Sequence, residues 1–132
     1  MRSFIHISKL QIEDFSYDES GKRSEDKKMA AVEILPGICG LKTKLILTAD
    51  EEQIVQVEIH SECPYITAMQ EELKDLDGYS ECFAKYSNST VYSVAEKNIK
   101  HLACPVPTAI IKGMEVACGW ALPKNVTLVI EK

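Results

Sequence analysis

Long apolar runs and an excess of positive charge are both missing from this sequence. No apolar stretch approaches the ~20 residues needed to span a bilayer, and residues 1–8 lack the features of a secretory signal. The chain carries 15 Lys and Arg against 20 Asp and Glu, a formal net charge of −5. Nucleic acid is disfavoured as the main partner because phosphate binding requires a positive surface. We therefore expect a cytoplasmic protein with no membrane and no nucleic-acid partner.

The familiar catalytic motifs are also missing. The chain has no phosphate-binding Gly-rich loop, no H-E-x-x-H and no G-x-S-x-G. The acidic pairs at residues 51–52 and 71–72 lie on a predicted exposed turn and helix, whereas paired-acid catalysis requires a cleft. We expect a non-enzymatic role, and an enzymatic one remains open.

Length and composition indicate one globular domain with an N-terminal extension. A chain of 132 residues suits a single domain, and 45% apolar and 27% charged residues are ordinary for globular proteins. Residues 13–28 are rich in charge, Ser and Gly and have no apolar period, as in solvated arms. The composition changes at Met29. We predict an extension over residues 1–28, disordered in part, and one domain over 29–132.

The order of strand and helix signals predicts an α+β fold. Strands and helices are segregated along the chain rather than alternating, which favours a small antiparallel sheet of three to four strands packed against three to four helices. Gly113, within the most apolar helix, would permit close approach of another element. The expected strands cover 31–35, 42–49, 53–60 and 125–131, and the expected helices cover 64 to about 76, 80–86, 90 to about 100, and 108–118.

Five cysteines, an odd number without an export signal, make a disulfide framework unlikely. Cys39 lies in a Pro/Gly turn, and Cys63 and Cys104 each precede a proline where a helix is predicted to begin. Free backbone N–H groups and the helix dipole favour a thiolate there, the form that binds metal. Cys82 and Cys118, on helical stretches, are expected to be buried small hydrophobes.

We therefore predict that Cys39, Cys63 and Cys104 meet at one metal or iron–sulfur site. No C-x-x-C pair is present, so the spacing is not that of a typical zinc finger. His101 lies three residues before Cys104 and is the predicted fourth ligand, since imidazole often accompanies thiolates. His60 has the same offset from Cys63, but the predicted strand places it on the opposite face, so His101 is favoured.

These cysteines resemble those of the iron–sulfur cluster assembly scaffold family, the NifU/IscU-like proteins. Cys39-Gly40 after a Pro-Gly turn, a strand running through Cys63 into a helix, and Cys104 before a long helix follow the family's order, at intervals of 24 and 41 residues. The resemblance covers about residues 31–120. It implies a NifU/IscU-like fold, a cluster held by the three cysteines, and a cysteine desulfurase or iron–sulfur acceptor protein as partner.

The sequence departs from that family's pattern at three points. Leu41 stands where members usually carry an aspartate, Ala103 precedes Cys104 where they carry histidine, and the Leu-Pro-Pro-Val-Lys chaperone motif is missing. Without the acidic neighbour, a bound cluster would lose an exchangeable oxygen ligand. The resemblance therefore implies a less labile site than in the scaffolds.

Three other functions compete with an iron–sulfur carrier. Three cysteines and a histidine also suit a closed tetrahedral zinc site. A thiol enzyme or sulfur acceptor would use Cys104 or Cys63 as nucleophile and His101 as base. A metal-free interaction module is the third alternative, consistent with the apolar last helix and the acidic surface.

Overall fold

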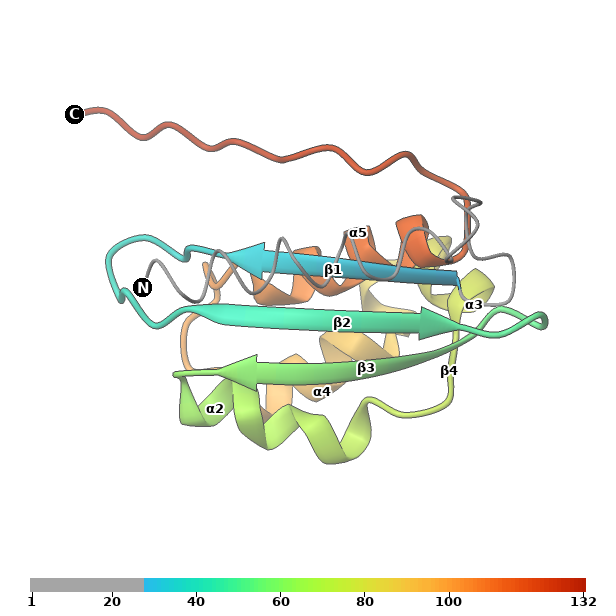
Figure 1. Cartoon of the computed structure of the whole chain (residues 1–132). Helices are drawn as coiled ribbons and strands as arrows, with labels where there is room; N and C mark the ends of the chain where they lie inside the picture. Colours follow the sequence, from blue (N-terminus) through green and yellow to red (C-terminus); the bar gives the residue numbers. More distant parts are fainter. Residues whose placement is uncertain (1–27) are drawn as a thin grey trace.

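The computed structural model describes residues 28–132, which fold into a four-stranded antiparallel sheet with helices packed against it (Figure 1). The predicted α+β class is therefore confirmed. The predicted extension falls outside the described residues except for Lys28, which begins the first strand. In spatial order the strands are β1 (Lys28–Ile34), β2 (Thr43–Ala49), β3 (Ile54–Ser61) and β4 (Leu76–Asp77).

Alternating side chains give the sheet a covered face and an opposite, outer face. Leu45 pairs with Val32 of β1 on one side and with Ile59 of β3 on the other, so these three side chains share the covered face. In β3 the next residues along, Glu58 and His60, point the opposite way and are exposed. This two-residue period is the one that the sequence predicted for the hairpin.

Short helical segments connect the sheet to two longer helices. The predicted helix from residue 64 to 76 is helical only as far as Glu72, and Leu76 instead pairs with Val55 and joins the sheet. The predicted 80–86 helix is split in two, whereas α4 and α5 lie close to their predicted bounds. The segments are α2 (Pro64–Thr67), η1 (Ala68–Glu72), α3 (Gly78–Cys82), η2 (Tyr86–Asn88), α4 (Thr90–Asn98) and α5 (Val106–Ala117). No described helix is long and apolar enough to cross a membrane.

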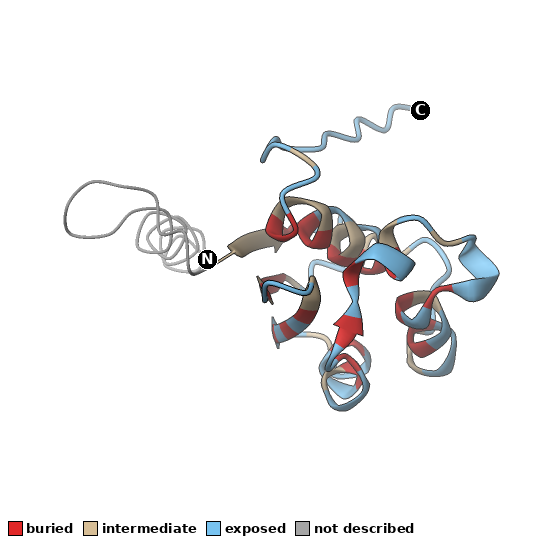
Figure 2. Cartoon of the chain, turned by 90° about the vertical axis from the view of Figure 1, so that its right-hand side faces the viewer, coloured by how far each residue is buried: buried red, intermediate tan, exposed pale blue. Residues whose placement is uncertain are grey.

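The predicted final strand at residues 125–131 is not formed. Residues 122–132 are extended and exposed, and they pair with no strand among residues 28–132 (Figure 2). Strand propensity reflects packing against neighbouring strands more than an intrinsic backbone preference. An apolar, β-branched segment therefore stays single when its own fold provides no strand beside it.

The core lies between the sheet and α5. Gly113 is buried in this contact, and a Cβ atom there would lie 2.6 Å from Leu47 Cδ1 and 2.8 Å from Val32 Cγ2. The predicted close approach at Gly113 is confirmed. The largest fully buried side chains are Leu45, Leu47, Ile66, Met69, Leu73, Ile110 and Met114.

A buried carboxylate positions the start of α4. The side chain of Glu81, from α3, accepts hydrogen bonds from Ser89 Oγ at 3.0 Å and from the backbone N–H groups of Thr90 and Val91, both at 2.8 Å. These amides belong to the first turn of a helix, where N–H groups have no intrahelical partner and negative charge is favourable. Glu81 thus joins α3 to α4.

We expect Glu81→Ala to lower the free energy of unfolding by about 1–3 kcal/mol, because the amides of Thr90 and Val91 lose their buried acceptor. Urea denaturation would measure the change. Glu96→Ala, an exposed acid on α4, is the control and should change stability by about 0.5 kcal/mol at most. Equal effects of the two substitutions would contradict the role of Glu81.

Candidate functional site

Three segments that carry cysteines come together at one end of the sheet, which we call the cysteine end. Ile34 pairs with Thr43, and Thr43 pairs with Ser61, so the β1–β2 loop and the end of β3 share this end. The far end of α5 is tied to the β2–β3 turn by the hydrogen bond from Gln53 Nε2 to the Cys118 carbonyl, 2.9 Å. The start of α5 therefore lies at the cysteine end as well (Figure 1).

Cys39 is exposed in the loop between β1 and β2. The predicted turn is present: Gly37 and Gly40 have φ angles of +95° and +69°, in the left-handed region, and the Gly40 N–H donates to the Gly37 carbonyl at 3.0 Å. Only glycine adopts such angles without strain. The loop therefore presents the Cys39 thiol to solvent on a short, tight turn.

Cys63 occupies the N-cap position of α2, as predicted. Its side chain makes no capping hydrogen bond; instead its N–H donates to Ser61 Oγ at 3.0 Å, and its carbonyl accepts from the Thr67 N–H at 3.0 Å. The thiol is left partly buried. Because α2 has only four residues, the dipole expected here from a longer helix is small.

Cys104 lies one residue before Pro105, the N-cap of α5. Burial raises the pKa of its thiol above the ordinary value, the Val106 N–H acts in the opposite direction, and Cys63 and Cys39 raise the pKa further. The helix-start amide therefore acts in the expected direction on Cys104, but the net effect is a raised pKa. Desolvation of the charged form outweighs the contribution of the helix amide.

The cysteine end is not a ready metal centre. Within residues 28–132, no group of three His, Cys, Asp or Glu side chains is arranged to hold a metal ion. Thiol sulfur and imidazole nitrogen are donors that suit a soft metal. In the observed geometry, however, the side chains of the predicted ligands do not lie close enough together to bind one ion; these are Cys39, Cys63, Cys104 and His101. His101 is exposed, and its carbonyl accepts from the Cys104 N–H at 3.1 Å. The predicted ligand set therefore stays a prediction.

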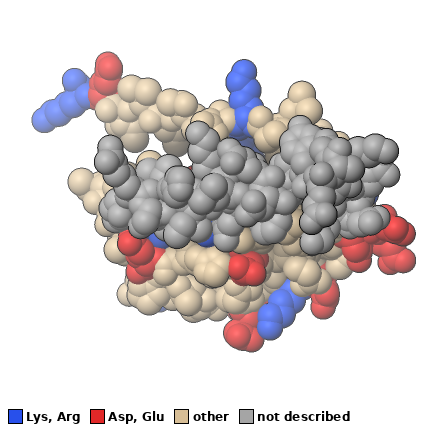
Figure 3. Space-filling model, viewed as in Figure 1, with Lys and Arg blue, Asp and Glu red and all other residues tan. Residues whose placement is uncertain are grey.

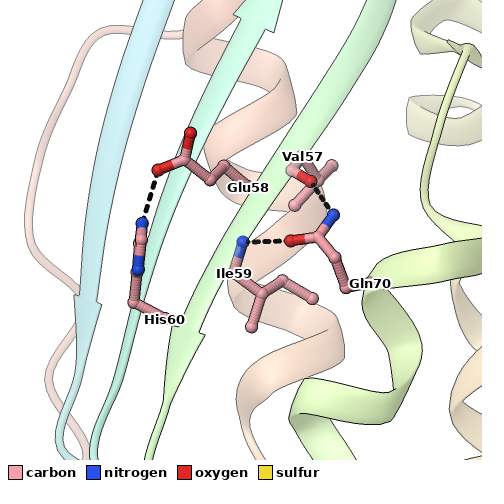
Figure 4. Close-up of polar contacts among 5 residues, drawn as sticks. All are labelled: Val57, Glu58, Ile59, His60 and Gln70. Atoms are coloured by element: carbon pink, nitrogen blue, oxygen red, sulfur yellow. Dashed lines mark hydrogen bonds and ion pairs between the residues drawn. The ribbon is translucent and has the colours of Figure 1, made fainter.

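His60 lies on the outer face of β3, as the strand period predicted. Its ring pairs with the carboxylate of Glu58, two residues away on the same face (Figure 4). Val57 and Ile59 face the core instead. Cys63 lies beyond the end of β3, and the contact of the His60 ring is with Glu58.

Exposed hydrophobic side chains accompany two of the cysteines, a feature that the sequence reasoning missed. Ile38 and Leu102 are fully exposed, and Leu35 and Leu41 are exposed as well. They project from the same two loops that carry Cys39 and Cys104. The sequence signal that could have predicted this exposed surface was Ile38, an apolar residue inside a Pro/Gly turn. Contiguous exposed apolar surface marks contact sites for ligands or partners.

The remaining two cysteines lie at the opposite end of the domain, and their predicted burial is complete for Cys118 and partial for Cys82. Cys118 is buried, and a Cβ atom on Gly78 would lie 2.7 Å from its Sγ. Cys82 packs against the core from α3. Burial raises the pKa of Cys118 and raises that of Cys82 to about 12, with Cys118 a further cause for Cys82.

Residues 30–130 match the sequence model of a family of unknown function, DUF6951. The chain belongs to this family. The DUF6951 match includes all five cysteines and most of the extended C-terminal segment, so both are parts of the family's domain. No curated protein and no solved structure matches the chain. The DUF6951 match provides no link to NifU/IscU-like scaffolds, and that resemblance stays a prediction.

The structure predicts an order of thiol reactivity in this DUF6951 protein. Cys39 should react first with iodoacetamide at pH 7.5, Cys63 and Cys104 more slowly, and Cys82 and Cys118 last, because the thiolate is the nucleophile and burial limits both access and ionisation. Peptide mass spectrometry over a time course would give the five rates. Labelling of Cys104 ahead of Cys39 would contradict this order and favour a thiol enzyme.

Proposed function

We propose that the cysteine end is the functional site, and that it binds a thiophilic metal ion or an iron–sulfur cluster transiently through Cys39, Cys63 and Cys104, with His101 as an additional ligand. The observation that carries the proposal is the arrival of three distant segments at one end of the sheet. Cysteine thiolates and imidazole are the ligands of zinc and iron–sulfur centres.

The open arrangement supports a carrier more than a permanent centre. Structural zinc sites are closed and tetrahedral, whereas Cys39 here is exposed on its loop. Loading would require the 35–42 loop to close toward Cys63 and Cys104, which are both partly buried. The tight turn within that loop would move as a unit. A site that must close to bind would also open to release its cargo.

Exchange with another protein would use the exposed side chains of Leu35, Ile38, Leu41 and Leu102. Burying apolar surface of this kind is favourable in association. By resemblance alone, the partner would be a cysteine desulfurase or an iron–sulfur acceptor protein.

A thiol enzyme or sulfur acceptor receives less support. A nucleophilic cysteine needs a lowered pKa or an adjacent base, whereas burial raises the pKa of Cys104. His101 is exposed and offers its carbonyl to the Cys104 N–H. We therefore rank this alternative below the carrier.

A metal-free interaction module is the second candidate. The exposed hydrophobic residues around Cys39 and Cys104 favour it, as does the open geometry of the thiols among the described residues. Under this function the cysteines would be side chains of a protein-binding surface. Replacing them would then change partner binding without changing metal content.

Anaerobic purification followed by reconstitution with ferrous iron and sulfide, or with zinc, tests the proposal. We expect one metal ion or cluster per chain. Each of Cys39→Ser, Cys63→Ser and Cys104→Ser should weaken binding by at least about a hundredfold, more than typical outer-shell losses. Elemental analysis, visible absorption and competition with a chelator would measure the effect.

The matched control is Cys82→Ser, since Cys82 is partly buried like Cys63 and Cys104 but lies elsewhere in the fold. This variant should bind metal as the parent chain does. A parent chain that stays colourless and metal-free after both treatments would overturn the carrier function. If Cys82→Ser loses as much metal binding as the three candidate-ligand variants, the loss would come from a disturbed fold and not from a missing ligand.

A further inference from the structure

The C-terminal segment, residues 122–132, which we call the arm, is an extended, largely apolar stretch that pairs with no strand among the described residues. Its large apolar side chains are exposed, from 60% for Val126 to 92% for Ile130. Lys124 lies near its base, residues 125–130 are uncharged, and Figure 3 shows the charged groups at its tip. Val126, Leu128 and Ile130 alternate with Thr127, Val129 and Glu131, so one face of the arm is wholly apolar and the other is mixed.

The base of this arm is held firmly. Gly119 has a φ angle of +83°, and the N–H groups of Trp120 and Ala121 both donate to the Glu115 carbonyl, at 2.9 and 3.2 Å. The Trp120 ring packs against Tyr79 and Phe83, with centroids 6.1 and 5.4 Å apart. Beyond these contacts the arm runs back along the length of the domain without touching the sheet (Figures 1 and 2).

The sheet has one protected edge. Along β3 beyond β4, the side chain of Gln70 takes the place of a strand: its Oε1 accepts from the Ile59 N–H at 2.7 Å, and its Nε2 donates to the Val57 carbonyl at 2.6 Å (Figure 4). Gln56 and Asp75 add a further pair, because the Asp75 N–H donates to Gln56 Oε1 at 3.0 Å. Such coverage prevents another strand from pairing there.

The opposite edge, β1, is open among the described residues. β1 pairs with β2 alone, and its seven residues include Ala30 and Val32, which pack on the core but are only partly buried. Beside them, Ala109 and Ile111 of α5 are also partly buried. A strand added to β1 would find hydrogen-bonding groups and an incompletely covered apolar face together.

We propose that the arm of one molecule adds as a strand to β1 of a second copy, and that the exchange is reciprocal. The seven residues from Asn125 to Glu131 match the length of β1. With Val126, Leu128 and Ile130 on the face of Ala30 and Val32, the arm completes the cover of α5. A second copy is favoured over the arm's own β1 because the Trp120 contacts hold the arm off its own sheet.

A two-fold exchange pairs the arm and the open β1 edge of both molecules at once, and it gives a closed dimer. The proposal is independent of the metal-carrier function. The arm leaves α5 at the end opposite to the cysteine end, and the proposed exchange uses none of the cysteine side chains.

Light scattering coupled to size-exclusion chromatography tests the proposal on the full chain. We expect a dimer for the parent, and a monomer both for a chain ending at residue 121 and for Leu128→Asp. The same charge placed beyond the paired stretch, in Lys132→Asp, is the matched control and should leave the dimer intact. Circular dichroism would show that the variants keep their fold.

Hydrogen exchange identifies the surface used. Peptides covering β1 should exchange at least about tenfold more slowly in the parent than in Leu128→Asp, because strand pairing protects backbone amides. A monomeric parent at all soluble concentrations would overturn the proposal, even with β1 protected. A dimer that survives Leu128→Asp and the truncation, or one that leaves β1 exchange unchanged, would overturn it too.

Discussion

Close packing of α5 against β1 and β2 is the contact on which the rest of the structure depends. Gly113 makes it possible, because any side chain there would meet Leu47 and Val32 at less than 3 Å. The helix covers β1 and β2, while α2 and η1 pack against β3. The start of α5 brings Cys104 to the end where β1 and β3 finish, and its end directs the C-terminal arm outward. One helix–sheet contact thus sets the positions of both candidate surfaces.

Opposing electrostatic effects decide the character of the cysteine end. The Val106 amide at the start of α5 lowers the pKa of Cys104, but burial raises it more, and the neighbouring thiols add to the rise. With its pKa raised, the Cys104 thiol is a poor nucleophile. It remains a suitable ligand, because a metal ion stabilises the thiolate and drives off the proton when it binds.

Much of the fold was predictable from local signals, and the failures have a common cause. The hairpin follows from alternation, and α4 follows from Ser89, whose hydroxyl accepts from the Tyr92 N–H as an N-cap. Residues 73–76 were misassigned because Leu73 and Leu76 also fit a helical stripe. Only the sheet shows that Leu76 pairs with Val55 and that Gln70 covers the edge of β3. Likewise, Asn125–Glu131 has strand composition but no strand beside it in its own described domain.

By itself, the sequence determined the fold class, the two-face pattern of the hairpin, the need for a small residue at Gly113, and the division of the cysteines into two sets. Those properties depend on residue size, periodicity and turn chemistry, which are local. The tertiary structure alone decided that Cys39, Cys63 and Cys104 share one end of the sheet without forming a ready ligand set. It also decided that burial raises the pKa of Cys104 and that the last apolar segment pairs with no described strand. These properties depend on the distances between segments far apart in sequence and on how far such segments bury one another's side chains. Local sequence patterns contain neither kind of information.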